Sequence, residues 1–383
     1  MNGPPAAPTA VRFRGLDGLR ALAVSLVVWH NFGRIPGTGR WGSLGTMRAG
    51  YVGVTLFLVL SGFLITHRLI DEIESSGTVN FRAFYLRRAA RLFPALALAL
   101  VVLVSLNASR HHPWPDTFAA LGSAAAYVFN FASLHASSTS PLGGPGWGHL
   151  WSLSVEEQFY FVWPVLLVGA AKRLSGQHLV RVLVSAGLVI TAWRTLLWRQ
   201  GASFSRLYLA TDVRFDALVL GAALAAGIRT WPQHRQGIKR FGWLMLPLLG
   251  GLLLLGNRGS AADPLARPGW LLGPGMLVVS VVSVALVWIA ANEAGGPVGR
   301  LLDSPIVVAI GKRSYGIYLF HFPALALAAE HGGWLVALGL TVLLTEGSYR
   351  LIERPALRRV PGWAKSPSPT GQTDDHVSRG AAF

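Results

Sequence analysis

The chain has 383 residues, of which 52% are hydrophobic and 13% charged, and its mean hydropathy is +0.45. This composition indicates an integral membrane protein and excludes a separate soluble domain. The absence of cysteine excludes disulfide bonds, thiolate catalysis and cysteine-ligated metals.

Apolar runs of about 17 to 25 residues recur along the chain, and a helix of that length crosses a hydrocarbon core of about 30 Å. The runs do not alternate as the strands of a membrane β-barrel do, so they predict an all-α, polytopic bundle. Segment 117–134 is a weaker, eleventh candidate. The ten predicted spans are 16–33, 50–67, 92–107, 152–171, 179–198, 208–228, 241–257, 270–292, 306–329 and 333–352.

The distribution of basic residues predicts the topology. If 117–134 does not cross and the N-terminus is cytoplasmic, most of the 34 Lys and Arg residues fall on the cytoplasmic side, as the positive-inside rule requires. If 117–134 crosses, every later loop changes side and the bias reverses. We therefore predict a multi-pass protein of the inner (cytoplasmic) membrane with about ten spans, both termini cytoplasmic, and 108–150 as an external or re-entrant excursion.

The net charge of +17 follows from the same loops, which form no recognisable nucleic-acid-binding module, so no nucleic-acid partner is expected. The predicted domains are an N-terminal tail at 1–12, a transmembrane domain at 13–360 and a disordered cytoplasmic tail at 361–383. The first apolar run lacks a small-residue cleavage site, which favours a first span over a cleaved signal peptide.

The first span begins with Asp17 and Arg20 and carries His30 about 15 Å further along the helix, at membrane depth. A neutral imidazole there could take a proton from a hydroxyl near neutral pH. The alternative is a histidine that is hydrogen-bonded between helices for packing.

Two further segments carry small or basic residues. Ser61 and Gly62 lie within the second span, where small residues permit close helix approach, so packing is favoured there over direct chemistry. Arg87, Arg88 and Arg91 share one helix face, since their spacings are three and four residues. They could bind the phosphates of a nucleotide-bearing donor, and the alternative is anchoring to anionic lipid.

The segment 147–165 places two adjacent carboxylates, Glu156 and Glu157, in a strongly apolar context with serines and aromatic residues. Ionised groups at membrane depth cost several kcal/mol, so the pair is a candidate functional site. The alternative places the glutamates at a helix N-terminus, where the helix dipole favours them and they face headgroups or water.

The segment 311–323 holds a second intramembrane histidine, His321, followed by Pro323, which loosens the local hydrogen-bond ladder. Between these two segments, Asp212, Arg214 and Asp216 could pair within one helical turn, which is the least costly way to hold charge near a membrane.

The order of these motifs resembles that of the acyltransferase 3 family, the membrane-bound acyltransferases that O-acylate sugars, surface polysaccharides, peptidoglycan and some macrolide antibiotics. The resemblance runs from about Phe13 to Pro361. Its pieces are Leu16–Ala21 with His30, Leu60–Ile65, Arg87–Arg91 with Pro94, Leu150–Tyr160, Arg214–Leu218, Ser314–Pro323 and Glu353–Pro355.

The resemblance implies transfer of an acetyl or other short acyl group from cytoplasmic acyl-CoA to a hydroxyl of a sugar, an envelope glycan or a glycosylated natural product of the macrolide type. No permanently bound cofactor and no metal are expected. Residues with implied roles are His30 as base, assisted by Glu156; Asp17 and Arg20 at the entrance; Arg87, Arg88 and Arg91 on the donor; and Ser61, Trp151, Ser154, Tyr315 and His321 around the substrates.

The chain departs from the family pattern at two positions. The family usually places ten residues between its first Arg and His, whereas nine separate Arg20 from His30, and Asn31 stands where the histidine would fall. That offset turns His30 roughly 80° away from the usual face, unless the helix is locally distorted. Thr55 stands where the family often has Asp.

A secondary transporter or flippase of a small polar or glycosylated metabolite is the alternative from another functional class. Ten spans with buried charges and glycine-broken helices suit a transporter equally well. However, transporters often contain two similar halves, and no internal repeat is apparent in this sequence.

Overall fold

The computed structural model describes residues 15–32, 49–134, 142–235, 242–258, 269–292, 296–328 and 333–364, and within these ranges the chain forms helices and no strand. The all-α prediction is therefore confirmed for this part of the chain. The predicted N-terminal tail 1–12, and residues 365–383 of the predicted C-terminal tail, lie outside the described residues.

Among the described residues, each of the ten predicted spans overlaps one α-helix over most of its length or, for 306–329, two α-helices. The span at 306–329 is divided at Arg313, because one helix ends at Lys312 and the next begins at Ser314. The helices are α1 (Leu16–Phe32), α3 (Ala49–Ser76), α4 (Phe81–Ser109), α7 (Leu150–Ala171), α8 (Gly176–Arg199), α10 (Thr211–Thr230), α11 (Met245–Arg258), α12 (Gly275–Asn292), α14 (Pro305–Lys312), α15 (Ser314–Ala328) and α16 (Gly333–Ser348).

Within the described ranges, five of these helices are long and apolar enough to cross a membrane by themselves: α3, α4, α8, α12 and α16 with its continuation to Arg358. The chain is thus a multi-pass membrane protein, and the number of about ten crossings stays a prediction. Shorter helices complete the fold: α5 (Trp114–Ala125), α6 (Phe129–Leu134), α9 (Phe204–Leu209), α13 (Pro297–Leu302) and α17 (Arg354–Arg358), which follows a π-helical turn at Tyr349–Glu353.

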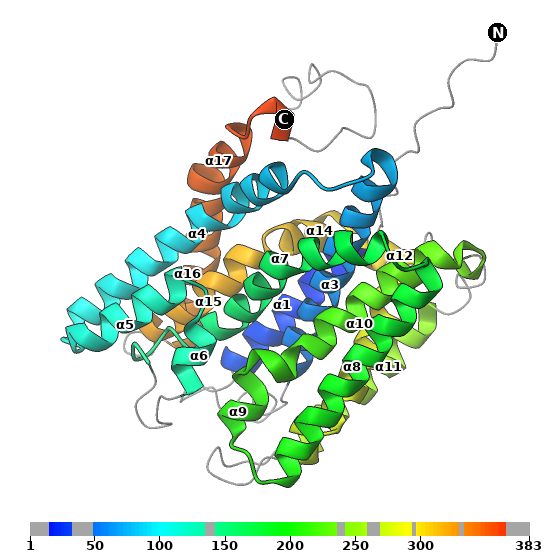
Figure 1. Cartoon of the computed structure of the whole chain (residues 1–383). Helices are drawn as coiled ribbons and strands as arrows, with labels where there is room; N and C mark the ends of the chain where they lie inside the picture. The colour runs from blue at the N-terminus through cyan, green and yellow to red at the C-terminus, as the bar shows by residue number, and fades with distance from the viewer. Residues whose placement is uncertain are drawn as a thin grey trace.

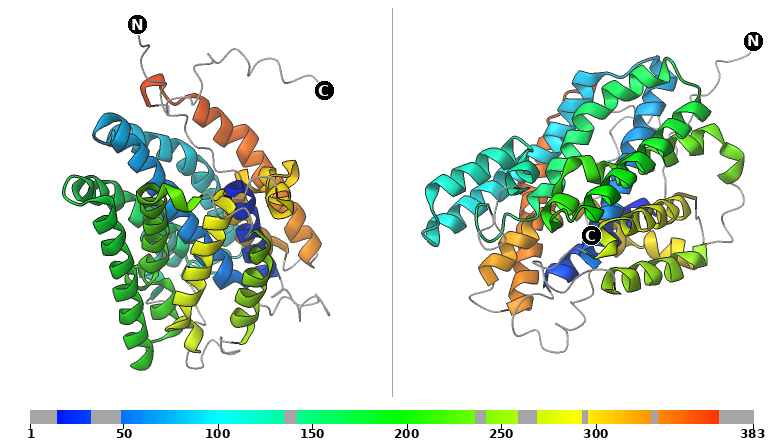
Figure 2. Two further views of the ribbon diagram at one scale, coloured as in Figure 1. Left: turned by 90° about the vertical axis from the view of Figure 1, so that its right-hand side faces the viewer. Right: turned by 60° about the horizontal axis from the view of Figure 1, so that its bottom comes forward.

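Helix α3 lies at the centre of the bundle, between α1 and α10, and α10 packs in turn on α8 (Figure 1). In Figure 2 (left) the blue α1 and α3 lie between the orange α15–α16 flank and the green α8–α10 flank. Close approach of α3 and α10 requires glycine, because a Cβ on Gly62 would overlap the Leu218 carbonyl oxygen and one on Gly221 would overlap that of Val59.

The segment 108–150 begins and ends at the same end of the bundle. Asn107, near the end of α4, donates from Nδ2 to Thr117 Oγ1 (2.9 Å) and to the Gly143 carbonyl oxygen (2.8 Å). Between these contacts the chain forms α5 and α6, of 12 and 6 residues, which are too short to cross the bilayer. The side of the membrane on which this segment lies stays a prediction.

The charged residues of α10 do not pair within one turn, so that expectation is wrong. Asp216 instead binds Arg194 of α8 at 2.9 Å, with side chains 1% and 0% exposed. Arg214 donates from Nη2 to Thr55 Oγ1 at 3.0 Å. Asp212 pairs with Arg206. The physical reason is that successive charges on a helix project in different directions, so each finds its partner on another element.

The buried group of Arg194, Arg214 and Asp216 contains two cations and one anion. Because Thr55 is the hydrogen-bond partner of Arg214, a second anion can be introduced at position 55. We expect Thr55→Asp to place a carboxylate on Arg214, replacing a neutral hydrogen bond with a charge-assisted one. A gain of about 1 kcal/mol would raise the unfolding temperature of the detergent-solubilised protein by about 2–4 °C.

The matched control is Thr341→Asp on α16. Thr341 is also buried, and its hydroxyl donates to the Ala337 carbonyl oxygen rather than facing a cation. That substitution should lower the unfolding temperature. An equal loss of stability in both variants would contradict this account of Arg214.

Candidate active site

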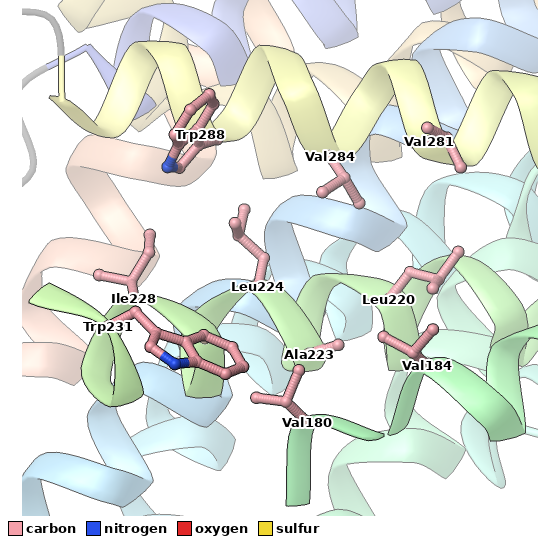
Figure 3. Close-up of a pocket in the computed structure, with 11 residues that line it drawn as sticks. Val180, Val184, Leu220, Ala223, Leu224, Ile228, Trp231, Val281, Val284 and Trp288 are labelled. Atoms are coloured by element: carbon pink, nitrogen blue, oxygen red, sulfur yellow. The ribbon is translucent and has the colours of Figure 1, made fainter. Parts of the chain in front are cut away.

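One hollow among the described residues is an apolar groove between α8, α10 and α12, with a volume of about 320 Å³ (Figure 3). Trp231 and Trp288 lie at one end of it, and aliphatic side chains such as Val184, Leu220 and Val281 form the rest. None of its lining side chains can act as an acid, a base or a nucleophile, so this groove is not a site for acyl transfer.

A second cavity, of about 90 Å³, lies between α1, α3, α4, α7 and α15 and is lined by most of the polar motifs. Its lining residues are Arg20, Val54, Phe57, Leu58, Ser61, Arg88, Arg91, Leu92, Ser152, Leu153, Glu156, Glu157, Tyr160, Ser314, Tyr315 and Tyr318. Six of the twelve predicted site residues are among them: Arg20, Ser61, Arg88, Arg91, Glu156 and Tyr315.

Helical periodicity explains why these residues share one cavity. On α7, Ser152, Glu156 and Tyr160 follow each other at intervals of four residues, so they lie on one face. Ser61 on α3 faces them across the cavity, and α4 contributes its arginines three residues apart. Each of the five helices therefore contributes lining residues from a motif that was identified in the sequence.

Glu156 accepts two hydrogen bonds on the same oxygen. Ser61 Oγ donates to Glu156 Oε1, and the Tyr160 hydroxyl donates to it at 2.7 Å. The two hydrogen bonds hold this oxygen in the cavity wall beside Ser61. Since Glu156 lies beyond the first turn of α7, which contains no acidic residue, the interpretation as a helix-dipole partner facing headgroups does not hold for it.

The neighbouring Glu157 has a different role, because it binds Arg88. Arg88 Nε donates to Glu157 Oε2 at 2.8 Å, Nη2 donates to Oε1, and the guanidinium lies 3.2 Å from the ring centroid of Tyr160. This bidentate pair already occupies the guanidinium fork that was predicted to bind phosphate. Arg88 therefore holds the cavity wall together.

Three other arginines gather at this cavity from three helices: Arg20, Arg91 and Arg68. Arg20 and Arg91 line it, and the positive charges of Arg20 and Arg68 act on Arg91. Arg87 lies apart from the cavity lining, 3.7 Å from Glu72. A bound anion offsets the mutual repulsion of clustered positive charges, so the cluster fits a phosphate-bearing ligand.

Asp17 does not line the cavity, but its charge acts on Arg68, which places it near the same cluster. Sequence analysis did not identify Arg68. The signal was available in its spacing, because Arg68 follows Ser61 by seven residues, or about two helical turns, on α3.

His30 does not line the cavity. Helix α1 is α-helical from Leu16 to Phe32, so no distortion compensates for the short Arg–His spacing. The imidazole instead packs beside Gly50 and Tyr51 at the start of α3, with ring centroids 5.9 Å apart in the pair with Tyr51. Asn31, at the usual family position, lies 3.3 Å from His321, with Nδ2 facing Nε2.

His321 is fully buried and is held through both ring nitrogens. Nδ1 lies 2.5 Å from the Tyr318 carbonyl oxygen, which can only accept, so Nδ1 carries the proton and Nε2 accepts from Asn31. His149, whose ring centroid is 5.4 Å from that of His321, donates from Nε2 to the Leu319 carbonyl oxygen. Pro323 lacks the N–H that would otherwise bind this oxygen.

The Tyr318 hydroxyl connects this histidine pair to the cavity. It lies 2.5 Å from Ser152 Oγ and donates to the His149 carbonyl oxygen at 2.9 Å. Both Ser152 and Tyr318 line the cavity, and neither was predicted. Their position could have been inferred, because Ser152 precedes Glu156 by four residues and Tyr318 follows Tyr315 by three.

The structure places the other predicted substrate residues differently. The Tyr315 hydroxyl donates to the Leu92 carbonyl oxygen at 3.1 Å, at the cavity wall. Trp151 packs against Tyr208, with centroids 4.7 Å apart, away from the cavity. Ser154 donates to the Leu150 carbonyl oxygen of its own helix. These two residues support the fold and do not line the cavity.

Comparison with known proteins adds independent information. A family model described as an acyltransferase domain matches residues 13–344. The peptidoglycan O-acetyltransferase OatA of Listeria monocytogenes is 31% identical over 358 residues, which cover 89% of this chain and 55% of the relative. The protein named "Putative peptidoglycan O-acetyltransferase YrhL" of Bacillus subtilis is 33% identical over 366 residues, covering 89% and 54%.

The chain thus spans about half the length of the curated relatives that it matches. No solved structure matches it. The matched region contains every helix that lines the cavity, from α1 to α15.

Proposed function

Because the chain belongs to the acyltransferase 3 family, we propose that it is a membrane O-acetyltransferase that moves an acetyl or other short acyl group to a hydroxyl of a cell-envelope glycan. The single observation that carries the proposal is the small cavity that joins the carboxyl group of Glu156 to a cluster of arginines between membrane helices. The relatives are named as peptidoglycan O-acetyltransferases, which supports a glycan as the acceptor class.

The donor in this proposal is acyl-CoA, which binds as a substrate and not as a resident cofactor. Its phosphates are held by Arg20, Arg68 and Arg91, since Arg88 is already paired with Glu157. A cavity of about 90 Å³ admits the acyl end of the molecule and leaves the nucleotide outside it. The basic cluster then lies on the cytoplasmic side, which is consistent with cytoplasmic termini.

Glu156 is the base in this proposal, in place of His30. It lines the cavity and is oriented by Tyr160, whereas His30 lies outside the lining. A carboxylate that is buried beside a reacting hydroxyl can take its proton as the carbon–oxygen bond forms. The adjacent arginines stabilise the negative charge that develops on the carbonyl oxygen.

We propose that the acceptor approaches from the opposite side, past Asn31, His149 and His321. The Ser152–Tyr318 contact joins these residues to the cavity and offers hydroxyl groups to a sugar. The hydrogen bond from Ser61 to Glu156 favours an enzyme over a transporter, because transport does not require a carboxylate aligned with a serine hydroxyl.

The proposal is tested in a deletion strain by mass spectrometry of envelope glycans, with lipids and secreted glycosylated metabolites measured in parallel. Ester-linked acyl groups on a glycan should disappear and return on complementation with the wild-type gene, but not with Glu156→Gln. Unchanged acylation of all three fractions in the deletion strain would contradict an acyltransferase function.

A further inference from the structure

We propose that Ser61 is a nucleophile and that the acyl group passes through an ester on its hydroxyl before it reaches the acceptor. This inference rests on the proposed function and concerns the same cavity. Ser61 is 4% exposed and lines the cavity, and its Oγ donates to Glu156 Oε1.

The hydrogen bond between Ser61 and Glu156 provides the groups that an activated nucleophile requires. A nucleophilic hydroxyl needs a base within hydrogen-bond reach, and that base needs a third group to orient it. Here Glu156 is the base for Ser61, and the Tyr160 hydroxyl orients it at 2.7 Å. Among the described residues that line the cavity there is no histidine, so Glu156 is the base that the geometry offers.

The position of Ser61 is fixed by its neighbour in the sequence. Gly62 brings the backbone of α3 against that of α10 at Leu218, so the two helices pack closely at the residue next to Ser61. Rigid placement of a reacting atom is a requirement for efficient attack. The packing role predicted for the Ser61–Gly62 pair thus belongs to Gly62, and Ser61 is directed into the cavity.

The chemistry balances in two steps. In the first, Ser61 Oγ attacks the thioester carbonyl carbon, its proton passes to Glu156, the carbon–sulfur bond breaks, and Glu156 returns the proton to the departing thiolate. In the second, the acceptor hydroxyl attacks the serine ester, its proton passes to Glu156, and Glu156 returns it to Ser61 Oγ. No other reactant is required.

The size of the cavity favours this double displacement over direct transfer. Its volume of about 90 Å³ is small beside the roughly 320 Å³ of the apolar groove. The reacting ends of a thioester and a glycan would crowd one another in such a space. Sequential occupation lets donor and acceptor use the same cavity at different times.

The test is isotope exchange in the purified full chain without acceptor. Labelled coenzyme A should enter unlabelled acetyl-CoA, because only a covalent intermediate allows the free thiol to reverse the first step. Acid-quenched protein should gain the mass of one acyl group on the peptide that contains Ser61. Ser61→Ala should reduce both signals by at least about 100-fold. Ser61→Cys, which keeps a nucleophile, should retain an adduct.

The matched control is Ser283→Ala, which removes the hydroxyl of a buried serine on α12, away from the cavity. It should leave exchange unchanged. Restoration of glycan esters in the deletion strain by Ser61→Ala would overturn the nucleophile while leaving the proposed function intact. A wild-type protein that turns over with acceptor but shows no exchange would also overturn it. Failure of the wild-type gene itself to restore esters would refute the proposed function.

Discussion

Replacing Glu156 by glutamine is expected to lower the rate of acyl transfer by about 10²–10⁴-fold, the usual contribution of a positioned base. The amide keeps the shape of the side chain and can still accept from Tyr160, but it cannot take a proton from a hydroxyl. The loss should therefore appear in kcat, with little change in the apparent affinity for the donor. Purified protein in proteoliposomes, assayed for release of the coenzyme A thiol, provides the measurement.

Two variants make this result specific. Glu74→Gln removes a carboxylate at the end of α3, where Glu74 pairs with Arg229 outside the cavity lining, and should retain wild-type turnover. His30→Ala should lower the rate less than Glu156→Gln, because His30 does not line the cavity. If His30→Ala abolished transfer in folded protein while Glu156→Gln preserved it, Glu156 would not be the base.

Neutralising Arg20 and Arg91 together is expected to raise the apparent KM for acyl-CoA at least about tenfold, which corresponds to about 1.4 kcal/mol of binding free energy. Both line the cavity, and their charges converge with that of Arg68. Because the interaction with phosphate is electrostatic, raising the salt concentration should weaken donor binding in the wild type more than in the double Gln variant.

The corresponding double Lys variant should recover only part of the affinity, since an ammonium group restores the charge but not the bidentate geometry. Arg206→Gln is the control, because Arg206 pairs with Asp212 outside the cavity. An unchanged KM in the double Gln variant would contradict donor binding by these arginines and would favour a role in lipid anchoring or topology.

The membrane helices could be predicted from sequence because hydrophobic length is a local property. Each of the ten runs, from 16–33 to 333–352, is helical over most of its described residues, and 117–134 is divided between two short helices. Charge pairing could not be predicted in the same way. Asp216 finds Arg194 on another helix, and which helices are neighbours is a tertiary property that one-dimensional spacing does not contain.

The same distinction between local and tertiary properties applies to the candidate site. Motif order identified Ser61, Arg91 and Glu156, which come together in the cavity. His30 was predicted from its depth in the membrane, but at about 100° per residue a shift of one position changes the face, and its ring lies against Tyr51 instead. The pairing of Arg88 with Glu157 was invisible in the sequence, because it joins α4 to α7.

The most direct test of the central claim, that this cavity is the site of acyl transfer, is an experimental structure of the protein with a non-hydrolysable thioether analogue of acetyl-CoA. The account predicts the acyl end between Ser61 and Glu156 and the phosphates beside Arg20 and Arg91. An ordered analogue whose acyl end contacts His30, with Ser61 and Glu156 untouched, would contradict it.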